Sequence, residues 1–456
     1  MSTTTSRQGR PPGPSAKRWR GNAAAYNKDR LAFLTANAAR YGDVFSYSSN
    51  TLVLSDPALI RDVFVRSNSD FHAEAPLFTN RADSAAMAAG TDAWMQSRRV
   101  GWRDMNQSMI TKHGPTMVRA LDDALSSASQ HGDDVNVYHV MRSYTGEMIT
   151  SFFFGPDAAN IARAADERSQ IAVRFMGSNV TLPKWLPHPR VRAAVGANQR
   201  LIAAVGDRVR RRRTEQRTDP QDLLDLLLCD RRAALSDDQI VRLLRVSLLA
   251  SYGSPGAALC WVVQILATHP VVCAAIRDEV NCAGMDDPHR LTYTTAIVHE
   301  TLRLYPPTWL MGREVARPCQ LSHWRLGPGD SLMFSPYVVH RDPRWWDRPN
   351  EFRPSRWLDE QSPPPAATYF PFGAGPRVCL GTQLGTFQLV TATARLAFGY
   401  DIDVTRAASD QSPGALLLPD GLRARFSPRQ GTSHPARSAP AGEQLSAGQA
   451  PGALLG

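Results

Sequence analysis

The sequence predicts a mainly α-helical protein that forms a single large domain with small β-sheets. Hydrophobic residues make up 43% of its 456 residues, and no Gly/Ser-rich or charged linker divides the interior. Apolar residues recur at helical spacing in most segments after Pro57, and strand-like runs lie near both ends. We therefore expect one domain over residues 21–429, a basic proline-containing arm at 1–20, and a tail at 430–456 that is disordered because it has few large apolar residues.

A β-hairpin is expected first, at residues 41–57, where strand-forming residues flank the polar turn SSN. Apolar periodicity then predicts helices over residues 58–67, 105–129, 135–154, 158–177, 190–215, 237–268 and 271–283. Strands return in residues 319–336. Residues 416–428, LLLPDGLRARFSP, predict a second hairpin around the turn PDG.

The charge balance raises the question of nucleic-acid binding, because the net charge is +10. Much of the excess lies in the first thirty residues and in the run RVRRRR at 208–213, which ends an expected helix. Neither run is interleaved with stacking aromatics or lies in a known binding motif. We interpret both as solvated surface and expect no nucleic-acid partner; basic residues around Arg98 could instead dock an acidic electron donor.

The N-terminal residues and the cysteines indicate the compartment. Residues 1–21 are basic but contain no apolar run, so neither a secretory signal nor a membrane anchor is expected, and no apolar stretch is long enough without interruption to predict a membrane span. The six cysteines show no CxxC or paired spacing, which favours free thiols in a reducing compartment. These features predict a soluble cytoplasmic protein of bacterial type.

Residues 372–381, FGAGPRVCLG, surround Cys379 with the features that a metal-bound thiolate needs. Gly373 and Gly375 can adopt positive φ and let the backbone turn tightly around the sulfur, where backbone amides can offset its negative charge. Arg377 supplies a charge suited to a carboxylate. A lone cysteine is ordinarily a small buried hydrophobe, but this context predicts a metal ligand.

The segment resembles the cysteine loop of the cytochrome P450 family, FxxGxRxCxG, which it matches at Phe372, Gly375, Arg377, Cys379 and Gly381. The resemblance covers nearly the whole chain, from about residue 11 to 429. It implies the fold of that family, with haem b as cofactor. It also implies that Cys379 is the axial iron ligand, with Phe372 and Arg377 in contact with the haem.

A second motif, HETLRLYPP, places Glu300 and Arg303 one helical turn apart. Such a pair alone is common on solvated helices. Because YPP follows it about eighty residues before the cysteine, it resembles the family's ExxR motif, and FRPSRW supplies the third member, Arg356. We expect a buried ionic triad that supports the haem pocket structurally.

Further haem contacts are implied by the resemblance. Trp94 and Arg98 in DAWMQSRR resemble the family's WxxxR element, whose arginine meets a haem propionate. Arg313 in MGREV and His340 in HRDP lie where the family places further propionate contacts. For His340 the alternative of a turn histidine that caps local backbone is equally compatible with the sequence.

The chain departs from the family in its long helix, residues 237–268. Where family members carry an acid followed by an alcohol for proton delivery to dioxygen, this chain aligns Gly253 and Ser254, followed by Pro255. Ser254 is therefore the candidate catalytic residue, and a water could replace the carboxylate. Pro255 is expected to bend the helix. Simple sequence drift that preserves the bend remains an alternative.

The implied function is a haem-thiolate monooxygenase that hydroxylates an apolar small molecule, such as a terpenoid secondary metabolite, with O2. Electrons would come from ferredoxin and an NAD(P)H-dependent ferredoxin reductase. The missing acid leaves peroxygenase, rearrangement or oxidative-coupling chemistry open, and a non-catalytic haem-binding protein is a further alternative. Candidate pocket residues, mainly apolar, are Phe78, Met87, Leu249, Gly253, Trp309, Leu310, Met311 and Leu416.

Overall fold

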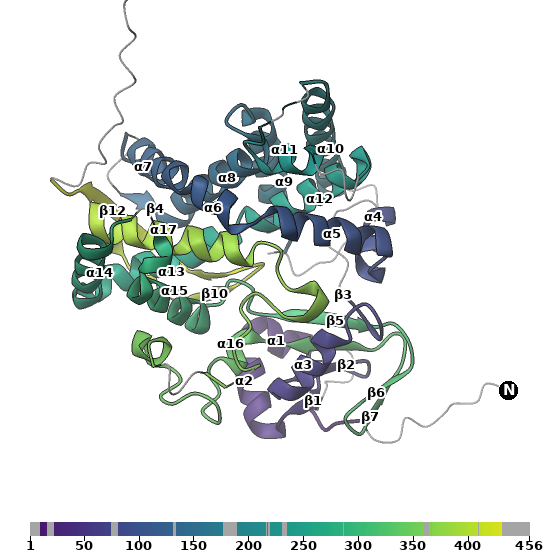
Figure 1. The fold of residues 1–456 in the computed structure, drawn as a ribbon. Helices are drawn as coiled ribbons and strands as arrows, with labels where there is room; N and C mark the ends of the chain where they lie inside the picture. Colours follow the sequence, from purple (N-terminus) through teal and green to yellow (C-terminus); the bar gives the residue numbers. More distant parts are fainter. Residues whose placement is uncertain are drawn as a thin grey trace, which may run out of the picture.

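A helical portion and a smaller sheet-containing portion make up the protein (Figure 1). The structure, a computed structural model, describes residues 10–15, 22–73, 81–130, 134–176, 189–215, 217, 219–229, 235–285, 287–359, 364–365, 367–408 and 410–430. Most of the predicted basic arm, and the predicted disordered tail beyond residue 430, lie outside these residues. The part of the arm that is described packs against the first strand, since the Ser46 N–H donates to the Pro12 carbonyl at 3.0 Å.

The helices confirm the predicted mainly α class. They are α1 (Ala23–Lys28), α2 (Arg30–Tyr41), α3 (Pro57–Val65), α4 (Arg81–Ala89), α5 (Asp92–Asp104), α6 (Gln107–Lys112), α7 (Gly114–Gln130), α8 (Val137–Phe154), α9 (Ala159–Met176), α10 (Pro189–Glu215), α11 (Leu223–Cys229), α12 (Asp237–Ser251), α13 (Ser254–Thr268), α14 (Pro270–Ala283), α15 (Thr292–Leu304), α16 (Pro336–Val339) and α17 (Thr382–Gly399). Short 3₁₀ turns occur at Pro288–Arg290, Pro354–Trp357 and Gly375–Arg377. The helix predicted over residues 105–129 is divided at His113 into α6 and α7, because Pro115 has no N–H to continue the ladder.

The largest sheet has the strand order β1-β2-β8-β5-β3. Its strands are β1 (Val44–Ser46), β2 (Thr51–Leu54), β3 (Phe71–Ala73), β5 (Met311–Val315) and β8 (Ser331–Phe334). β1 and β2 pair antiparallel, which confirms the first predicted hairpin, and β2 pairs with β8 in parallel. The strands predicted in residues 319–336 are confirmed as β8 and the antiparallel pair β6 (Cys319–Leu321) and β7 (Trp324–Leu326).

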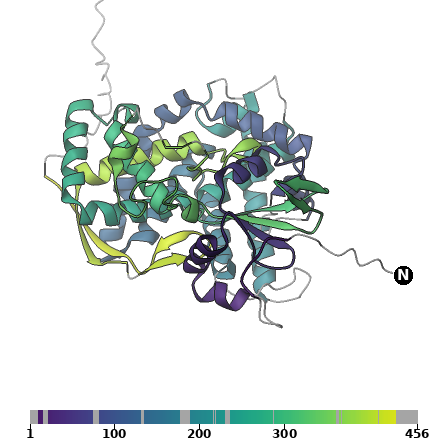
Figure 2. The same cartoon turned by 90° about the horizontal axis from the view of Figure 1, so that it is seen from below.

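The second predicted hairpin is wrong. β11 (Leu417–Pro419) pairs with β10 (Gln411–Pro413), whereas β12 (Arg423–Pro428) pairs with β9 (Tyr400–Arg406) and with β4 (Val135–Asn136). The PDG turn thus leads from one sheet to another, because β11 pairs with the strand just before it, whereas β12 pairs with β9 and with the distant β4. Figure 2 shows the C-terminal strands, in yellow, extending to the purple N-terminal helices, where the Arg30 guanidinium donates to the Pro413 carbonyl.

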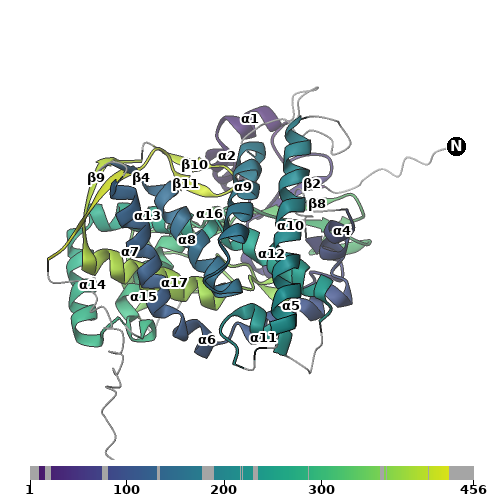
Figure 3. The same ribbon diagram turned by 90° about the horizontal axis from the view of Figure 1, so that it is seen from above.

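The core is built around α8, α13 and α17, which lie together inside the helical portion (Figure 3). Ten of the fifteen residues of α13 are buried, and α8 is apolar on most of its circumference, as expected of a helix packed on several sides. Small residues allow the close approach of α8 and α13: a Cβ built on Gly256 would lie 3.2 Å from the Arg142 backbone nitrogen. These three helices form the rigid frame of the site.

In residues 237–268, where a bend was predicted, the helix is interrupted at Tyr252 and Gly253, both of which keep right-handed helical backbone angles. α12 ends at Ser251 and α13 begins at Ser254, with Pro255 in its first turn. The Thr145 hydroxyl donates to the Tyr252 carbonyl at 3.2 Å and so satisfies one group that the break exposes. Among the described residues this stretch is also long and apolar enough to cross a membrane, but 56% of its most apolar window is buried inside the protein, as in a core helix.

Candidate functional site around Cys379

A cavity of about 370 Å³ lies between the broken helix and the Cys379 loop. On one side it is bounded by α12 and the start of α13, and on the other by the segment before α17. The lining combines Cys379 and the basic side chains of Arg98, Arg313 and Arg377 with a largely apolar remainder. All four groups were predicted to contact one cofactor from segments nearly three hundred residues apart, and the fold brings them together.

Glycines shape the loop that presents Cys379. Gly373 and Gly375 adopt φ values of 70° and 68°, as the sequence predicted. A Cβ on Gly375 would lie 2.3 Å from the Phe64 carbonyl oxygen, so the loop requires glycine there. The Cys379 N–H donates to the Phe372 carbonyl at 2.9 Å, which closes the loop.

Cys379 lines the cavity and is exposed there. Burial raises its pKa, while a hydrogen bond from the Gly381 backbone and the charge of Arg98 act in the opposite direction. Both groups would stabilise a thiolate ligand: the backbone hydrogen bond is of the kind expected from the sequence, whereas Arg98 was predicted only as a propionate contact. Arg98 is held in place by a hydrogen bond of 2.7 Å from its guanidinium to the Val378 carbonyl.

The cavity also carries donors suited to carboxylates. Burial, with the nearby charges of Arg98 and Arg313, lowers the pKa of Arg377 to about 10. Among the described residues that line the cavity there is no Asp or Glu. The Trp94 indole N–H and the Arg377 Nη2 are buried without a hydrogen-bond partner in the described part of the chain, and such groups normally have one.

Haem fits this arrangement. The buried donors of Trp94 and Arg377 and the arginines of the lining lie around a single thiol. This combination suits a cofactor that carries both carboxylates and a metal. In the part of the chain that the structure describes, no three His, Cys, Asp or Glu side chains cluster, so an iron bound by Cys379 would take its remaining ligands from the cofactor. Phe372, predicted as a haem contact, also lines the cavity.

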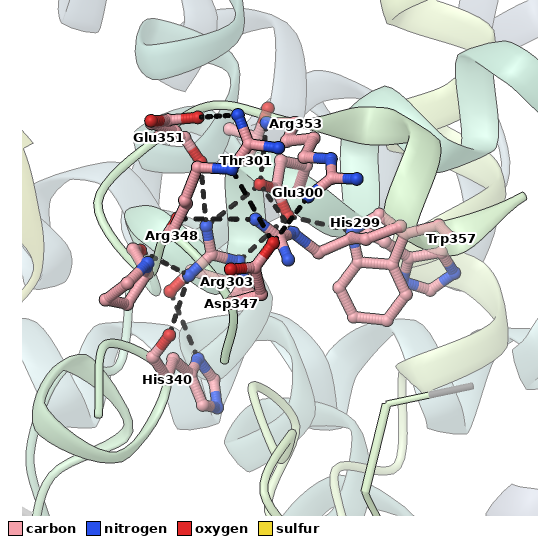
Figure 4. Close-up of polar contacts among 12 residues, drawn as sticks. His299, Glu300, Thr301, Arg303, His340, Asp347, Arg348, Glu351, Arg353 and Trp357 are labelled. Atoms are coloured by element: carbon pink, nitrogen blue, oxygen red, sulfur yellow. Dashed lines mark hydrogen bonds and ion pairs between the residues drawn. The ribbon is translucent and has the colours of Figure 1, made fainter. Parts of the chain in front are cut away.

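The predicted ionic triad is confirmed as a contact network (Figure 4). The Arg303 Nε lies 2.8 Å from Glu300 Oε2, and the Arg356 Nε lies 3.1 Å from Glu300 Oε1. Burial alone would raise the pKa of Glu300, but the hydrogen bond and charge of Arg303 lower it overall. The sequence did not indicate a further donor, the Trp357 indole, at 2.9 Å from Glu300 Oε2.

The predicted propionate contact of His340 is wrong. His340 is fully buried outside the cavity lining. Its Nδ1 lies 3.2 Å from the Arg303 carbonyl, and its Nε2 accepts the Phe370 N–H at 3.0 Å. Burial lowers its pKa to about 3. The side chain therefore ties the triad helix to the segment before the cysteine loop, which agrees with the alternative of a backbone-capping histidine.

On the opposite side of the cavity, Ser254 lies in the lining as predicted. Its hydroxyl is 3.4 Å from the Ala250 carbonyl, the acceptor one turn earlier. Ser247 and Ser251 also face the cavity, and the Ser251 hydroxyl donates to the Ser247 carbonyl at 2.8 Å. The interrupted helix thus contributes three serines to the cavity lining.

The residues predicted to form the substrate pocket lie in different places. Met311 lines the cavity, whereas Met87, Leu249, Gly253, Trp309, Leu310 and Leu416 lie outside its lining. Phe78 lies outside the described residues. Trp309 instead packs with the N-terminal helices, and its indole donates to the Gly414 carbonyl at 3.0 Å. The sequence alone did not show to which side of the chain these apolar side chains turn.

Several cavity residues were not among the candidates named individually from the sequence. Val246, Ala250, Pro307 and Thr308 line the space next to Ser254 and Met311. A helical-face argument from Ser254 would have found the first two, because they lie eight and four residues before it on the same face. Pro307 and Thr308 follow the triad motif directly and had no periodic signal.

Comparison with known proteins agrees with this geometry. The description of the family whose model matches residues 11–420 is Cytochrome P450. A putative cytochrome P450 139 of Mycobacterium tuberculosis is 30% identical over 302 residues, 63% of this chain and 70% of that protein. Cyclooctatin synthase of Streptomyces melanosporofaciens is 29% identical over 318 residues, 66% of this chain and 69% of that protein.

A solved structure shares the fold. Retinoic acid-bound cyanobacterial CYP120A1 aligns with a TM-score of 0.79 at 21% identity and covers 92% of this chain and 99% of that one. Its fold includes the helical portion and the small sheets described above. Because the family match spans the cysteine loop, the triad and the broken helix together, the chain belongs to the cytochrome P450 family and is an oxidoreductase of the monooxygenase class.

Proposed function

We propose that this protein hydroxylates an apolar small molecule, a terpenoid of secondary metabolism being the best-supported class. The observation that carries the proposal is the cavity itself, whose thiol and arginines lie opposite a face built mainly from apolar residues. A relative named cyclooctatin synthase and a similar fold that holds retinoic acid support an apolar substrate of this kind.

Haem b, when bound, would supply the iron centre at which dioxygen is activated. Cys379 would hold the iron, and Trp94, Arg98, Arg313 and Arg377 would hold the carboxylates. These donors and charges would hold the cofactor in the cavity that α12 and α13 also line.

The opposite wall would bind and orient the substrate. Ala250, Thr308 and Met311 bring small or apolar surface close to Ser254, which excludes water from the reacting carbon. The Ser254 hydroxyl would hold a proton near the oxygen-binding position, since hydroxyls can both donate and accept. Its reach into the cavity is the reason to retain it as the candidate catalytic residue.

Electrons would come from a ferredoxin with its NAD(P)H-dependent reductase. The helix α5, which carries Arg98 toward the cavity, exposes Arg99 and Arg103 on its outer side. An acidic ferredoxin docked there would approach the thiol side of the cavity, and salt would weaken that docking. We also propose a cytoplasmic location and no nucleic-acid partner.

A second candidate function follows from the broken helix. No carboxylate occupies position 253, so proton delivery by an acid at that place is absent. Chemistry that starts from peroxide would depend less on proton delivery by an acid. The same holds for a rearrangement or coupling without oxygen insertion. Turnover with hydrogen peroxide in place of NADPH and ferredoxin would favour this candidate.

The first experiment is the absorption spectrum of the reduced protein with carbon monoxide. A Soret band near the long-wavelength position of thiolate-ligated haem is expected, and Cys379→Ala should abolish it while Cys282→Ala, at an exposed cysteine, should keep it. Titration of the ferric protein with terpenes and fatty acids should then produce a spin shift for the right class. Absence of the band in folded, haem-loaded protein would refute the proposal.

A further inference from the structure

Gly253 stands where family members carry a carboxylate, and side chains from two other segments lie next to it. A Cβ built on Gly253 would lie 3.0 Å from Leu416 Cδ1 and 3.4 Å from the Tyr138 hydroxyl oxygen. Leu416 comes from the β10–β11 connection and Tyr138 from the first turns of α8. A larger side chain at 253 would have to displace one of them, so the glycine and its two neighbours form one packing unit.

The β10–β11 connection that carries Leu416 is held firmly. The Trp261 indole donates to the Leu417 carbonyl at 3.1 Å, and the Leu417 N–H donates to the Pro307 carbonyl at 3.0 Å. Together with the bond from Trp309 to Gly414, these contacts hold the tip against α13 and the segment after α15. Leu416 therefore forms a fixed wall, which leaves the Tyr138 hydroxyl as the polar group on the other side of Gly253.

Tyr138 is held by the packing of α8 against α13 and is partly buried. Burial raises the pKa of its phenol, against the nearby charge of Arg142, so the hydroxyl keeps its proton near neutral pH and can donate. The break in the helix offers an acceptor, because Pro255 has no N–H to give to the Ser251 carbonyl. A neutral donor and an open acceptor thus flank the same two-residue gap.

We propose that Tyr138 is a positioning residue that replaces the missing carboxylate by holding a water molecule at the break next to Ser254. The proposal rests on the proposed monooxygenase function. The water would bridge the Tyr138 hydroxyl and the backbone freed by Pro255, and it would return to the Ser254 hydroxyl the proton that Ser254 gives up. Its proton would in turn be replaced from solvent, so the phenol itself stays protonated.

Tyr138→Phe tests the role because it removes only the hydroxyl oxygen. Tyr144→Phe on the same helix is the matched control, since Tyr144 is fully buried and is not one of the side chains that a Cβ at Gly253 would meet. Peroxide released per NADPH consumed should rise at least threefold in Tyr138→Phe and stay unchanged in Tyr144→Phe. The assay uses ferredoxin and its reductase, without substrate and with farnesol as an apolar probe.

A crystal structure supplies a readout that does not depend on turnover. Wild-type protein should show an ordered water within hydrogen-bond distance of the Tyr138 hydroxyl and the Ser251 carbonyl or Ser254 hydroxyl, and Tyr138→Phe should lose it with the helix break unchanged. A dry contact between Tyr138 and Leu416 in the wild type, or unchanged peroxide release in Tyr138→Phe, would overturn the proposal. Absence of the carbon monoxide band would instead refute the proposed function. The crystal structure would still show whether the ordered water is present, so the two failures can be told apart.

A third experiment restores a carboxylate at position 253. Gly253→Asp combined with Leu416→Ala makes room on the side where the built Cβ is most crowded. In the Tyr138→Phe background this pair should bring peroxide release back toward the wild-type value. Leu416→Ala with Tyr138→Phe, without the aspartate, is the control and should remain uncoupled. Equal peroxide release by the variants with and without the aspartate would show that no proton-relay group is needed at this place. That result would contradict the proposal.

Discussion

The backbone of Gly375 lies directly against the carbonyl of Phe64, so that a Cβ at position 375 would come within 2.3 Å of that oxygen. The contact joins the end of α3 to the turn that precedes Cys379. With φ at 68° in addition, position 375 excludes side chains for two independent reasons. The geometry of the thiol is thus set by packing between segments three hundred residues apart.

Gly375→Ala should therefore abolish thiolate ligation without unfolding the protein. The methyl group cannot be accommodated against backbone, so the loop must shift and carry Cys379 with it. The reduced carbon monoxide spectrum should lose its long-wavelength Soret band, while circular dichroism keeps its helical signal. Gly385→Ala, whose Cβ would meet only Phe372 at 3.8 Å, is the control and should retain the band.

Glu300→Gln should destabilise the fold by about 3–5 kcal/mol, because it leaves the buried Arg303 without its charge partner. Urea unfolding followed by circular dichroism measures this loss. Asp207→Asn removes an exposed partner of Arg210 and should change stability by less than about 1 kcal/mol. Similar losses in both variants would contradict the structural role of the triad.

Because of His340, the free energy of unfolding should fall as the pH is lowered. Its folded pKa of about 3 lies below the ordinary value of 6.5, so the unfolded chain binds a proton first as pH falls. The stabilisation is complete above pH 6.5 and is lost between there and pH 3, at up to about 1.4 kcal/mol per pH unit. His340→Gln should flatten the urea stability curve over this range; an unaltered slope would refute the assignment.

Arg377→Met should weaken haem retention. Charge-assisted hydrogen bonds contribute about 1.5–3 kcal/mol. Loss of one corresponds to haem affinity that is roughly 10–100-fold weaker, and to haem loss that is faster by up to the same factor. Transfer of haem to an apoglobin acceptor measures the effect. Arg348→Met, at an exposed arginine outside the cavity, should transfer haem at the wild-type rate, and equal transfer by both variants would remove Arg377 from the haem site.

Gly146→Ala should disturb the helix break. A Cβ at 146 would lie 2.4 Å from the Tyr252 ring, so Tyr252 must move, at a cost of about 1–3 kcal/mol. The same substitution in a Tyr252→Ala background should cost less, and a double-mutant cycle by urea unfolding measures the difference. An additive result would show that the two residues do not share this contact.

Local chemistry alone was sufficient for part of this protein. The positive φ of Gly373 and Gly375, the pairing of Glu300 with Arg303 and the distortion of the helix near Pro255 each depend on residues close in sequence, where backbone preference or helical spacing decides the outcome. The mainly α class followed from periodicity in the same way. These features were predicted correctly because their physical causes act over one or two turns of chain.

The tertiary structure decided what depends on direction and on distant partners. His340 turned toward Arg303 and Phe370 rather than the cavity, Trp309 turned toward the N-terminal helices, and the strands around the PDG turn paired with different sheets. An apolar or titratable side chain is compatible with either side of its segment, and only the competition among packed neighbours selects one. For the same reason the contact of Tyr138 with the gap at Gly253 has no signal in the sequence, since its cause is the packing of α8 against α13.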